Sequence, residues 1–180
     1  NSLIDLNKAF TNKSYKILKK KGYQLVKPLI IYHITNDKIK SKNINLSLDF
    51  QLEENSSLKI IDLFNDNSEK NFLNIFYNFD LKQNAILKNY KIDKIENTNV
   101  KYSFNNIEQA ANSLSETFIL SSGSHFFKNE INCNLNGKYS SAFINGIFSL
   151  SNDRHHEVRT TINHLTENTK SYQLIKSVLN

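Results

Sequence analysis

The segment Asn43-Ile44-Asn45-Leu46-Ser47-Leu48-Asp49-Phe50-Gln51-Leu52 decides the fold class. Its apolar side chains occupy every second position, and polar side chains fill the positions between them. Successive side chains of a β-strand point to opposite faces, so this alternation gives one apolar face and one polar face. In a helix the same apolar residues would spread around the whole circumference. We therefore predict a strand with one buried face over residues 43–52.

The same alternation recurs along the chain. Further strands are predicted at residues 58–64, 73–81, 131–135 and 157–164. Ile60 and Ile61 interrupt the first of these, where we expect a bulge or a corner. Polar stretches rich in Asn, Asp and Ser are expected to form turns; they cover residues 36–42, 65–71, 96–99 and 166–170. Residues 107–118 are the best helix candidate, although the general pattern favours strands there too.

Many short strands without convincing helices leave three architectures: a sandwich, a closed barrel or a parallel β-solenoid. Three features favour the solenoid. Asn-Gly hairpin signals occur only at residues 136–137 and 145–146, and the chain has only 4 glycines. The Asn-rich polar faces also suit stacked coils, in which like residues align. No exact internal repeat gives the coil length.

Composition excludes several functional classes. The chain has 180 residues, one cysteine, a net charge of +6 and a pI near 9.2. One cysteine cannot form an intramolecular disulfide, and no apolar run reaches the roughly 18–20 residues that span a bilayer. The lysines are scattered, and no nucleic-acid-binding motif accompanies them. We therefore expect neither a nucleic acid nor a membrane as partner.

There is no P-loop, GxSxG or GxGxxG motif, so ATP hydrolysis would come from a partner.

Two groups of segments resemble the SufB/SufD family of iron–sulfur cluster assembly proteins. The first comprises Leu6-Asn7-Lys8-Ala9-Phe10, Gly22 and Lys27-Pro28-Leu29-Ile30. The second comprises Leu135-Asn136-Gly137, Asn145-Gly146-Ile147-Phe148, the block His155–His164, and then Ser171, Gln173, Leu174, Lys176 and Leu179. The block is similar to the SufD pattern His-x-Asp-x-x-Thr-x-x-x-His, with Glu157 in place of the typical Asp. Thr169 stands where family members often have a cysteine.

The resemblance implies an all-β fold, a right-handed parallel β-helix. It implies one SufBD-type core domain over residues 1–180, the front part of the coil without the flanking helical regions and with an unpaired last turn. The expected function is that of a scaffold subunit and not of an enzyme, acting with a SufB-like scaffold and a SufC-like ATPase. A homodimer is an alternative assembly, and an iron–sulfur cluster would be held transiently in the complex. The implied location is cytoplasmic, or alternatively a plastid-type organelle.

The candidate site residues are one cysteine and several histidines, and no catalytic residue is predicted. Cys133 and His164 are candidates for cofactor binding, and Cys133 and His155 for metal binding. Alternation places Cys133 with Ile131 and Leu135 towards the coil interior, where it is either a packed apolar residue or a thiolate activated by nearby positive charge. The spacing of His155, His156 and His164 disfavours local chelation and favours structural hydrogen bonds. The cluster site known at the family's interface would lie beyond residue 180.

An alternative function is a β-helix enzyme of the pectate-lyase type that acts on polysaccharide. Such enzymes need convergent carboxylates, Ca²⁺ or a basic catalytic group on the outside of the coil. The sequence shows no such set, which favours the scaffold.

Overall fold

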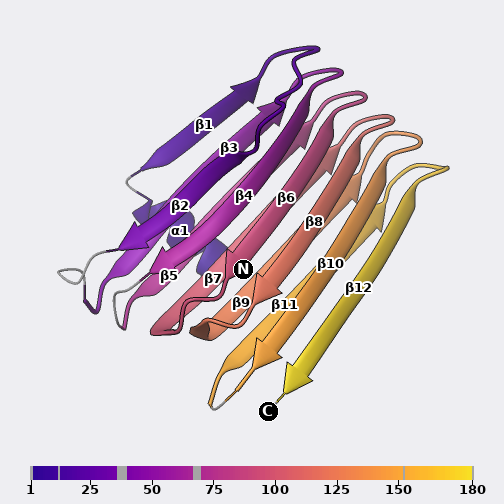
Figure 1. The fold of residues 1–180 in the computed structure, drawn as a ribbon. Helices are drawn as coiled ribbons and strands as arrows, with labels where there is room; N and C mark the ends of the chain where they lie inside the picture. The colour runs from indigo at the N-terminus through magenta and orange to yellow at the C-terminus, as the bar shows by residue number, and fades with distance from the viewer. Residues whose placement is uncertain (1, 12, 36–39, 67–69, 152, 180) are drawn as a thin grey trace.

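The computed structural model describes residues 2–11, 13–35, 40–66, 70–151 and 153–179. Within them, one helix precedes a series of strands that form two six-stranded parallel sheets. We call these the odd sheet (β1-β3-β5-β7-β9-β11) and the even sheet (β12-β10-β8-β6-β4-β2). The elements are α1 Ser2–Phe10, β1 Ser14–Lys19, β2 Leu29–Thr35, β3 Asn43–Leu52, β4 Ser57–Asp66, β5 Phe72–Leu81, β6 Ile86–Asp93, β7 Asn97–Gln109, β8 Leu114–Ser121, β9 Ser124–Leu135, β10 Ser141–Leu150, β11 His155–His164 and β12 Lys170–Leu179 (Figure 1).

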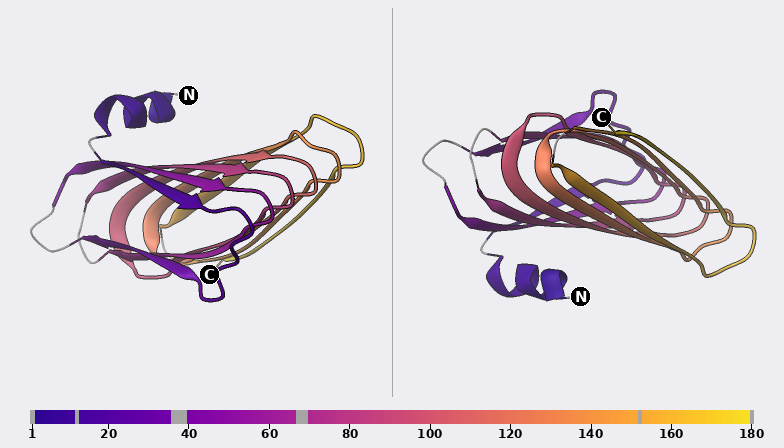
Figure 2. Two further views of the ribbon diagram at one scale, coloured as in Figure 1. Left: turned by 90° about the horizontal axis from the view of Figure 1, so that it is seen from above. Right: turned by 90° about the horizontal axis from the view of Figure 1, so that it is seen from below.

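The chain winds as a flattened coil whose two long sides are the two sheets (Figure 2). Each coil contributes one odd strand and one even strand, and each strand pairs with the equivalent strand of the next coil. Phe50 lies beside Phe79, and Phe79 beside Ile107, so one coil takes 28 or 29 residues here. This arrangement confirms the predicted β-solenoid.

The core fills the space between the sheets with aligned side chains. In β3, the residues Leu48, Phe50 and Leu52 are buried, as the alternation predicts. Phe50 stacks on Phe79 of the next coil with ring centroids 4.9 Å apart. Burying one side chain of this size stabilises the fold by about 1.5–3 kcal/mol. Because the coils are in register, each coil adds such side chains to the same apolar column.

Asparagine has a structural role at the turns between odd and even strands. Asn55, Asn84, Asn112 and Asn168 adopt positive φ at equivalent positions of their coils, and Tyr139 takes this position in the coil between the last two. Asparagine tolerates this left-handed conformation better than most residues. The Nδ2 group of Asn84 donates to Oδ1 of Asn55 at 2.8 Å, which links neighbouring turns. A small residue follows each turn; Ser56, for example, donates to the carbonyl of Glu53 at 2.6 Å.

Helix α1 lies against the outer face of the odd sheet, next to β3 and β5 (Figure 2). Asn7 anchors it, because its Nδ2 donates to the carbonyls of Asn74 at 2.6 Å and Leu46 at 3.2 Å. Asn74 in turn donates to the carbonyl of Leu3 at 2.8 Å. The sequence pattern of residues 2–10 did not predict this helix. Within the described residues, no helix is long and apolar enough to cross a membrane.

Some local predictions need correction. Residues 107–118 form the end of β7, a turn and the start of β8, so the helix alternative there is wrong. No bulge interrupts the pairing at Ile60 and Ile61; the irregularity lies in β7, between Asn97 and Val100. β7 already begins at Asn97, so the turn predicted at 96–99 is too long. Parts of the predicted turns at 36–42 and 65–71 lie outside the described residues.

Candidate functional site

The interior of the coil contains charged side chains where a solenoid core is normally apolar. Asp62 and Lys91 have no exposed side-chain surface, and Asp93 and Lys101 are 1% exposed. A charge in such a place is tolerated only when it is paired and hydrogen-bonded. The four residues form two separate ion pairs, each surrounded by further polar groups.

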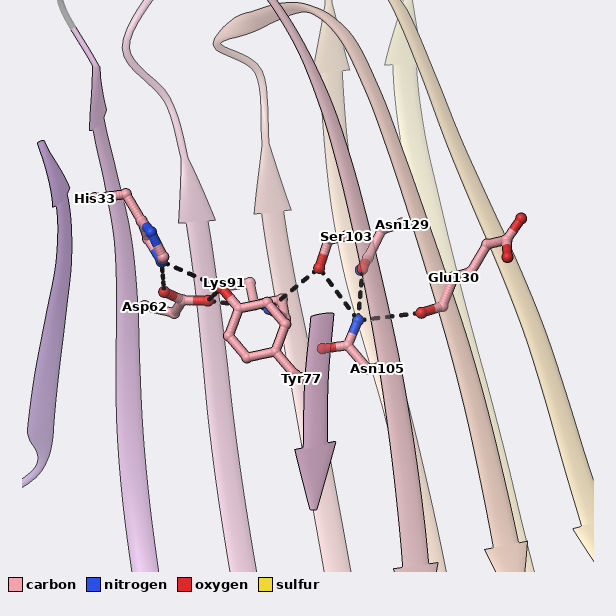
Figure 3. Close-up of polar contacts among 8 residues, drawn as sticks. All are labelled: His33, Asp62, Tyr77, Lys91, Ser103, Asn105, Asn129 and Glu130. Carbon is pink, nitrogen blue, oxygen red and sulfur yellow. Dashed lines mark hydrogen bonds and ion pairs between the residues drawn. The ribbon is translucent and has the colours of Figure 1, made fainter. Parts of the chain in front are cut away.

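The first group, which we call the Asp62 cluster, consists of Asp62, His33, Tyr77 and Lys91 (Figure 3). One carboxylate oxygen of Asp62 lies 2.6 Å from Nε2 of His33. The other accepts a hydrogen bond from Lys91 at 3.0 Å and one from the Tyr77 hydroxyl at 2.6 Å. Asp62, His33 and Lys91 project from the even sheet and Tyr77 from the odd sheet, so the cluster ties the two sheets together.

Electrostatics inside the Asp62 cluster favours the ionised carboxylate. Burial alone would raise the pKa of Asp62, but Lys91 and His33 hold it well below its ordinary value. Burial lowers the pKa of Lys91, and Asp62 opposes that change. Burial and the neighbouring carboxylate both raise the pKa of Tyr77, which therefore stays a hydrogen-bond donor. The ammonium of Lys91 also lies 3.4 Å from the centre of the Tyr77 ring.

The second group, the Asp93 cluster, consists of Asp93, Lys101, Ser124, His156 and Ser121. Lys101 pairs with Asp93 at 3.0 Å, and the Ser124 hydroxyl donates to the same carboxylate at 2.7 Å. Nε2 of His156 donates to the Ser124 carbonyl at 2.7 Å, so Nδ1 is left to accept from Ser121 at 2.8 Å. Burial lowers the pKa of His156, while the bond to Ser124 opposes this shift.

Polar side chains continue from the Asp62 cluster into later coils. Lys91 lies 3.5 Å from the hydroxyl of Ser103, and Asn105 donates to Asn129 at 2.9 Å (Figure 3). Three buried side-chain atoms in this part of the interior have no hydrogen-bond partner: Oδ1 of Asn89, Oδ1 of Asn105 and Nδ2 of Asn129. Groups of this kind are commonly satisfied by buried water.

Each cluster reaches a cavity at one end of the coil. His33 lines a largely apolar cavity of about 550 Å³ between β1, β2 and β3. His156 lines a cavity of about 570 Å³ together with Arg154 of the β10–β11 turn and Gln173 of β12. The interior therefore holds fixed charges of both signs, and a histidine lines the cavity at each end of the coil.

Cys133 lies in the interior, as its alternation with Ile131 and Leu135 predicts. Its register neighbours are Ile107 and Ile162, and its thiol lies 3.1 Å from Oε1 of Gln109. Burial raises the pKa of the thiol to about 12, and a hydrogen bond with Ser115 only partly opposes this. The surroundings favour a packed, protonated thiol, because a reactive thiolate needs a lowered pKa and access.

We therefore expect Cys133 of the native protein to resist thiol reagents at pH 8. Burial blocks access, and the raised pKa keeps the sulfur protonated. The measurement is the rate of disulfide exchange with an aromatic disulfide reagent, with and without denaturant. The thiol should react in full only after unfolding. Rapid stoichiometric reaction in the native state would contradict the packed arrangement.

The other predicted residues are not brought together with Cys133 into one site. His155 is exposed and stacks on Phe126, with ring centroids 5.1 Å apart. His164 lies at the last turn, with Nδ1 2.6 Å from the Thr169 hydroxyl and Nε2 3.0 Å from that of Ser171. Within the described residues, no group of three or more His, Cys, Asp or Glu is arranged to hold a metal ion. The metal and cofactor roles of these residues stay predictions.

The fold and the interior together define a two-sheeted parallel β-helix with buried ion pairs. Residues 35–180 match the family described as "SUF system FeS cluster assembly, SufBD core domain". This match covers most of the chain, so the protein belongs to the SufBD family. The family indicates involvement in iron–sulfur cluster assembly through the SUF system, and its core is a scaffold-type domain rather than a catalytic one. No curated protein matches the chain.

Proposed function

We propose that the protein is a SufD-like scaffold subunit that acts with a SufB-like scaffold and a SufC-like ATPase. The family match carries this proposal. The block from His155 to His164, which resembles the SufD pattern, supports the finer assignment. The iron–sulfur cluster is the cargo of the assembly, and ATP hydrolysis belongs to the SufC-like partner.

The interior supports a scaffold role through rigidity. A scaffold must hold its partner surfaces at a fixed geometry, and the Asp62 cluster links the two sheets across the core. Networks in which buried polar groups are satisfied also help to specify a single arrangement. The Asp93 cluster joins β6 to β9 and β11 in the same way.

The test is anaerobic co-expression of the intact protein with SufB-like and SufC-like partners from the same source. We expect one complex that contains all three chains, measured by native mass and subunit composition. If the protein elutes alone, the proposed partnership is wrong. The protein could instead form a complex with the SufC-like ATPase that excludes the SufB-like chain. In that case the protein takes the place of the SufB-like chain, so the SufD assignment is wrong although the role in cluster assembly remains.

A further inference from the structure

The positive charge of the chain is concentrated at one end of the coil. Residues 13–42 contain nine of the 23 Lys and Arg residues of the chain and one of its 17 Asp and Glu residues. This segment therefore has a net charge of +8 and the rest of the chain −2, which together give the overall +6. Lysines that look scattered along the sequence thus gather, within the described segments 13–35 and 40–42, where β1 and β2 begin the coil (Figure 1).

The same end of the coil exposes the edges of both sheets. β1 is the first strand of the odd sheet and β2 the first strand of the even sheet, so each pairs with one neighbour in the described part of the chain. The carbonyls of Lys13 and Lys19 accept hydrogen bonds from the β3 side, at 3.4 and 2.9 Å. Consecutive residues of a strand turn their amide and carbonyl to opposite edges, so Ser14, Lys16 and Leu18 present theirs to the free edge.

A largely apolar cavity of about 550 Å³ lies between the two free edges. Tyr15 and Ile17 of β1 line it from one side, and Leu29 and Ile31 of β2 line it from the other. The register places Tyr15 and Ile17 beside the core residues of β3, yet Tyr15 is 51% exposed because no described strand covers it. Cavities of this size with mainly apolar walls are typical of binding sites.

The lysines beside this cavity are available to a partner. Lys16 lines the cavity, and the exposed Lys13 and Lys20 lie directly before and directly after β1. Among the described residues, Lys21 pairs with Glu54 of the next coil, and the other three lysines named here have no acidic partner. An anionic partner would therefore meet uncompensated positive charge next to the free edge of β1.

The opposite end of the coil shows that this charge is not a general consequence of an exposed end. β12 also exposes apolar side chains, with Tyr172 53% and Val178 55% exposed, and a cavity of about 570 Å³ lies beside it. Residues 155–180, however, contain three basic and two acidic residues. The two ends thus share apolar exposure and a cavity, and only the first coil adds a strong positive charge.

We propose that the first coil binds an extended acidic segment of a partner protein, which adds a strand to the free edge of β1. Its backbone would pair with Ser14, Lys16 and Leu18. Its apolar side chains, at every second position, would enter the cavity beside Tyr15 and Ile17, and the acidic side chains between them would face the lysines. Strand addition takes its affinity from main-chain hydrogen bonds and its specificity from alternate side chains.

The lysines disfavour other occupants of this edge. Lysine on an edge strand is a common protection against pairing with an identical edge, because like charges repel each other. A nucleic acid would satisfy the positive charge, but it has no strand backbone to pair with the amides and carbonyls of β1. An acidic strand matches the charge, the free edge and the apolar cavity together.

Fluorescence polarisation with the intact protein and a labelled octapeptide tests the proposal without any SUF partner. The peptide alternates glutamate with valine and is blocked at both ends. We expect saturable binding that weakens about tenfold between about 50 and about 500 mM salt, because salt screens exposed charges. Two control peptides should not bind: one has lysine in place of glutamate, and one has N-methyl groups on the amides of one edge. Failure of the first peptide to bind, or equal binding of all three, would overturn the proposal.

Variants of β1 test where the peptide binds. Leu18→Pro removes a backbone amide from the free edge and leaves the β1–β3 hydrogen bonds in place, whereas Leu18→Ala keeps that amide. We expect Leu18→Pro to weaken peptide binding about tenfold and Leu18→Ala to bind like the wild type. Lys16→Glu should also weaken binding about tenfold, and Lys176→Glu, in the last coil, is the matched control without effect. Circular dichroism checks that each variant is folded. If Lys16→Glu binds the peptide as tightly as Lys176→Glu does, the first coil is not the site.

Discussion

Replacement of Asp62 by alanine is expected to lower the free energy of unfolding by about 3–5 kcal/mol. The change removes the only carboxylate in the Asp62 cluster and leaves the ammonium of Lys91 fully buried. The Tyr77 hydroxyl and His33 lose the same acceptor. An unpaired charge in the interior destabilises the fold by more than the intact ion pair stabilises it. Replacing Asp62 alone is therefore more severe than replacing both members of the pair. Urea unfolding followed by circular dichroism measures the effect.

Two further variants distinguish the charge effect from simple truncation. The double variant Asp62→Leu with Lys91→Met removes both charges, and we expect it to be more stable than Asp62→Ala. Glu54→Ala breaks the exposed Lys21–Glu54 pair, and its expected cost is below about 1 kcal/mol. If Asp62→Ala costs no more than Glu54→Ala, the buried cluster does not stabilise the fold.

The same cluster predicts the direction of acid sensitivity. The folded-state pKa of Asp62 lies below the ordinary carboxyl value of about 3.9. The contribution of ionised Asp62 to the free energy of unfolding is therefore complete above the ordinary carboxyl pKa and is lost as the pH falls below it. The unfolding free energy of Asp62→Asn should fall less steeply than that of the wild type in this acidic range.

Much of the fold could be predicted because some strands, such as β3, follow a simple rule. In β3 the apolar residues Leu48, Phe50 and Leu52 face the core, and the residues between them are polar. This alternation gives the strand and its buried face directly. The family resemblance then supplied the parallel coil. Helix α1 was missed because it is short and is held by Asn7, whose contacts with β3 and β5 are tertiary.

The site lies in strands whose two faces depart from that rule. They include the even strands and also β7, where Lys101, Ser103 and Asn105 point into the core. In β8, Phe118 and Leu120 point outwards, while Ser115 and Thr117 point into the core. A prediction that placed the apolar residues of β8 inside would have exchanged its inward and outward faces. In β4, Ile60 and Asp62 point inwards and Ile61 points outwards, so both faces look mixed. The pattern interpreted as a bulge was therefore the sign of a charged interior and an apolar exterior.

The residues of the clusters could not be found from spacing along the chain. His33 and Lys91 are far apart in sequence, and only the stacking of coils brings both to Asp62. Their separations from Asp62 are each one coil length, 29 residues. The recurring left-handed Asn55, Asn84 and Asn112 carry nearly the same period. A search for asparagine followed by a small residue at this interval would have given the coil length, and with it the alignment of the buried charges.

Gly137→Ala is expected to cost about 3 kcal/mol or more, and it is the second large effect predicted here. A Cβ atom at Gly137 would lie within 2.5 Å of backbone atoms of Ala110 and Ala111, in the turn of the preceding coil. The amide of Gly137 already donates to the carbonyl of Gln109 at 3.0 Å, so the two turns cannot separate without breaking the stack. A backbone clash cannot be relieved by a change of rotamer, which distinguishes it from ordinary overpacking.

The matched variants are alanine replacements at two other glycines. At Gly146 the tight contacts of the new methyl group would be with the side chains of Ile175 and Phe148, at 3.0 Å, and these can move; the backbone oxygen of Ile119, at 3.6 Å, is at ordinary contact distance. At Gly22 it would meet open space, and the cost there is limited to the left-handed backbone, about 1–2 kcal/mol. Urea unfolding should therefore rank Gly137→Ala as the most destabilising of the three. Equal losses at Gly137 and Gly22 would mean that the turns of successive coils are not stacked as closely as the structure places them. In that case the close turn-to-turn contact would not be what holds the later coils in register.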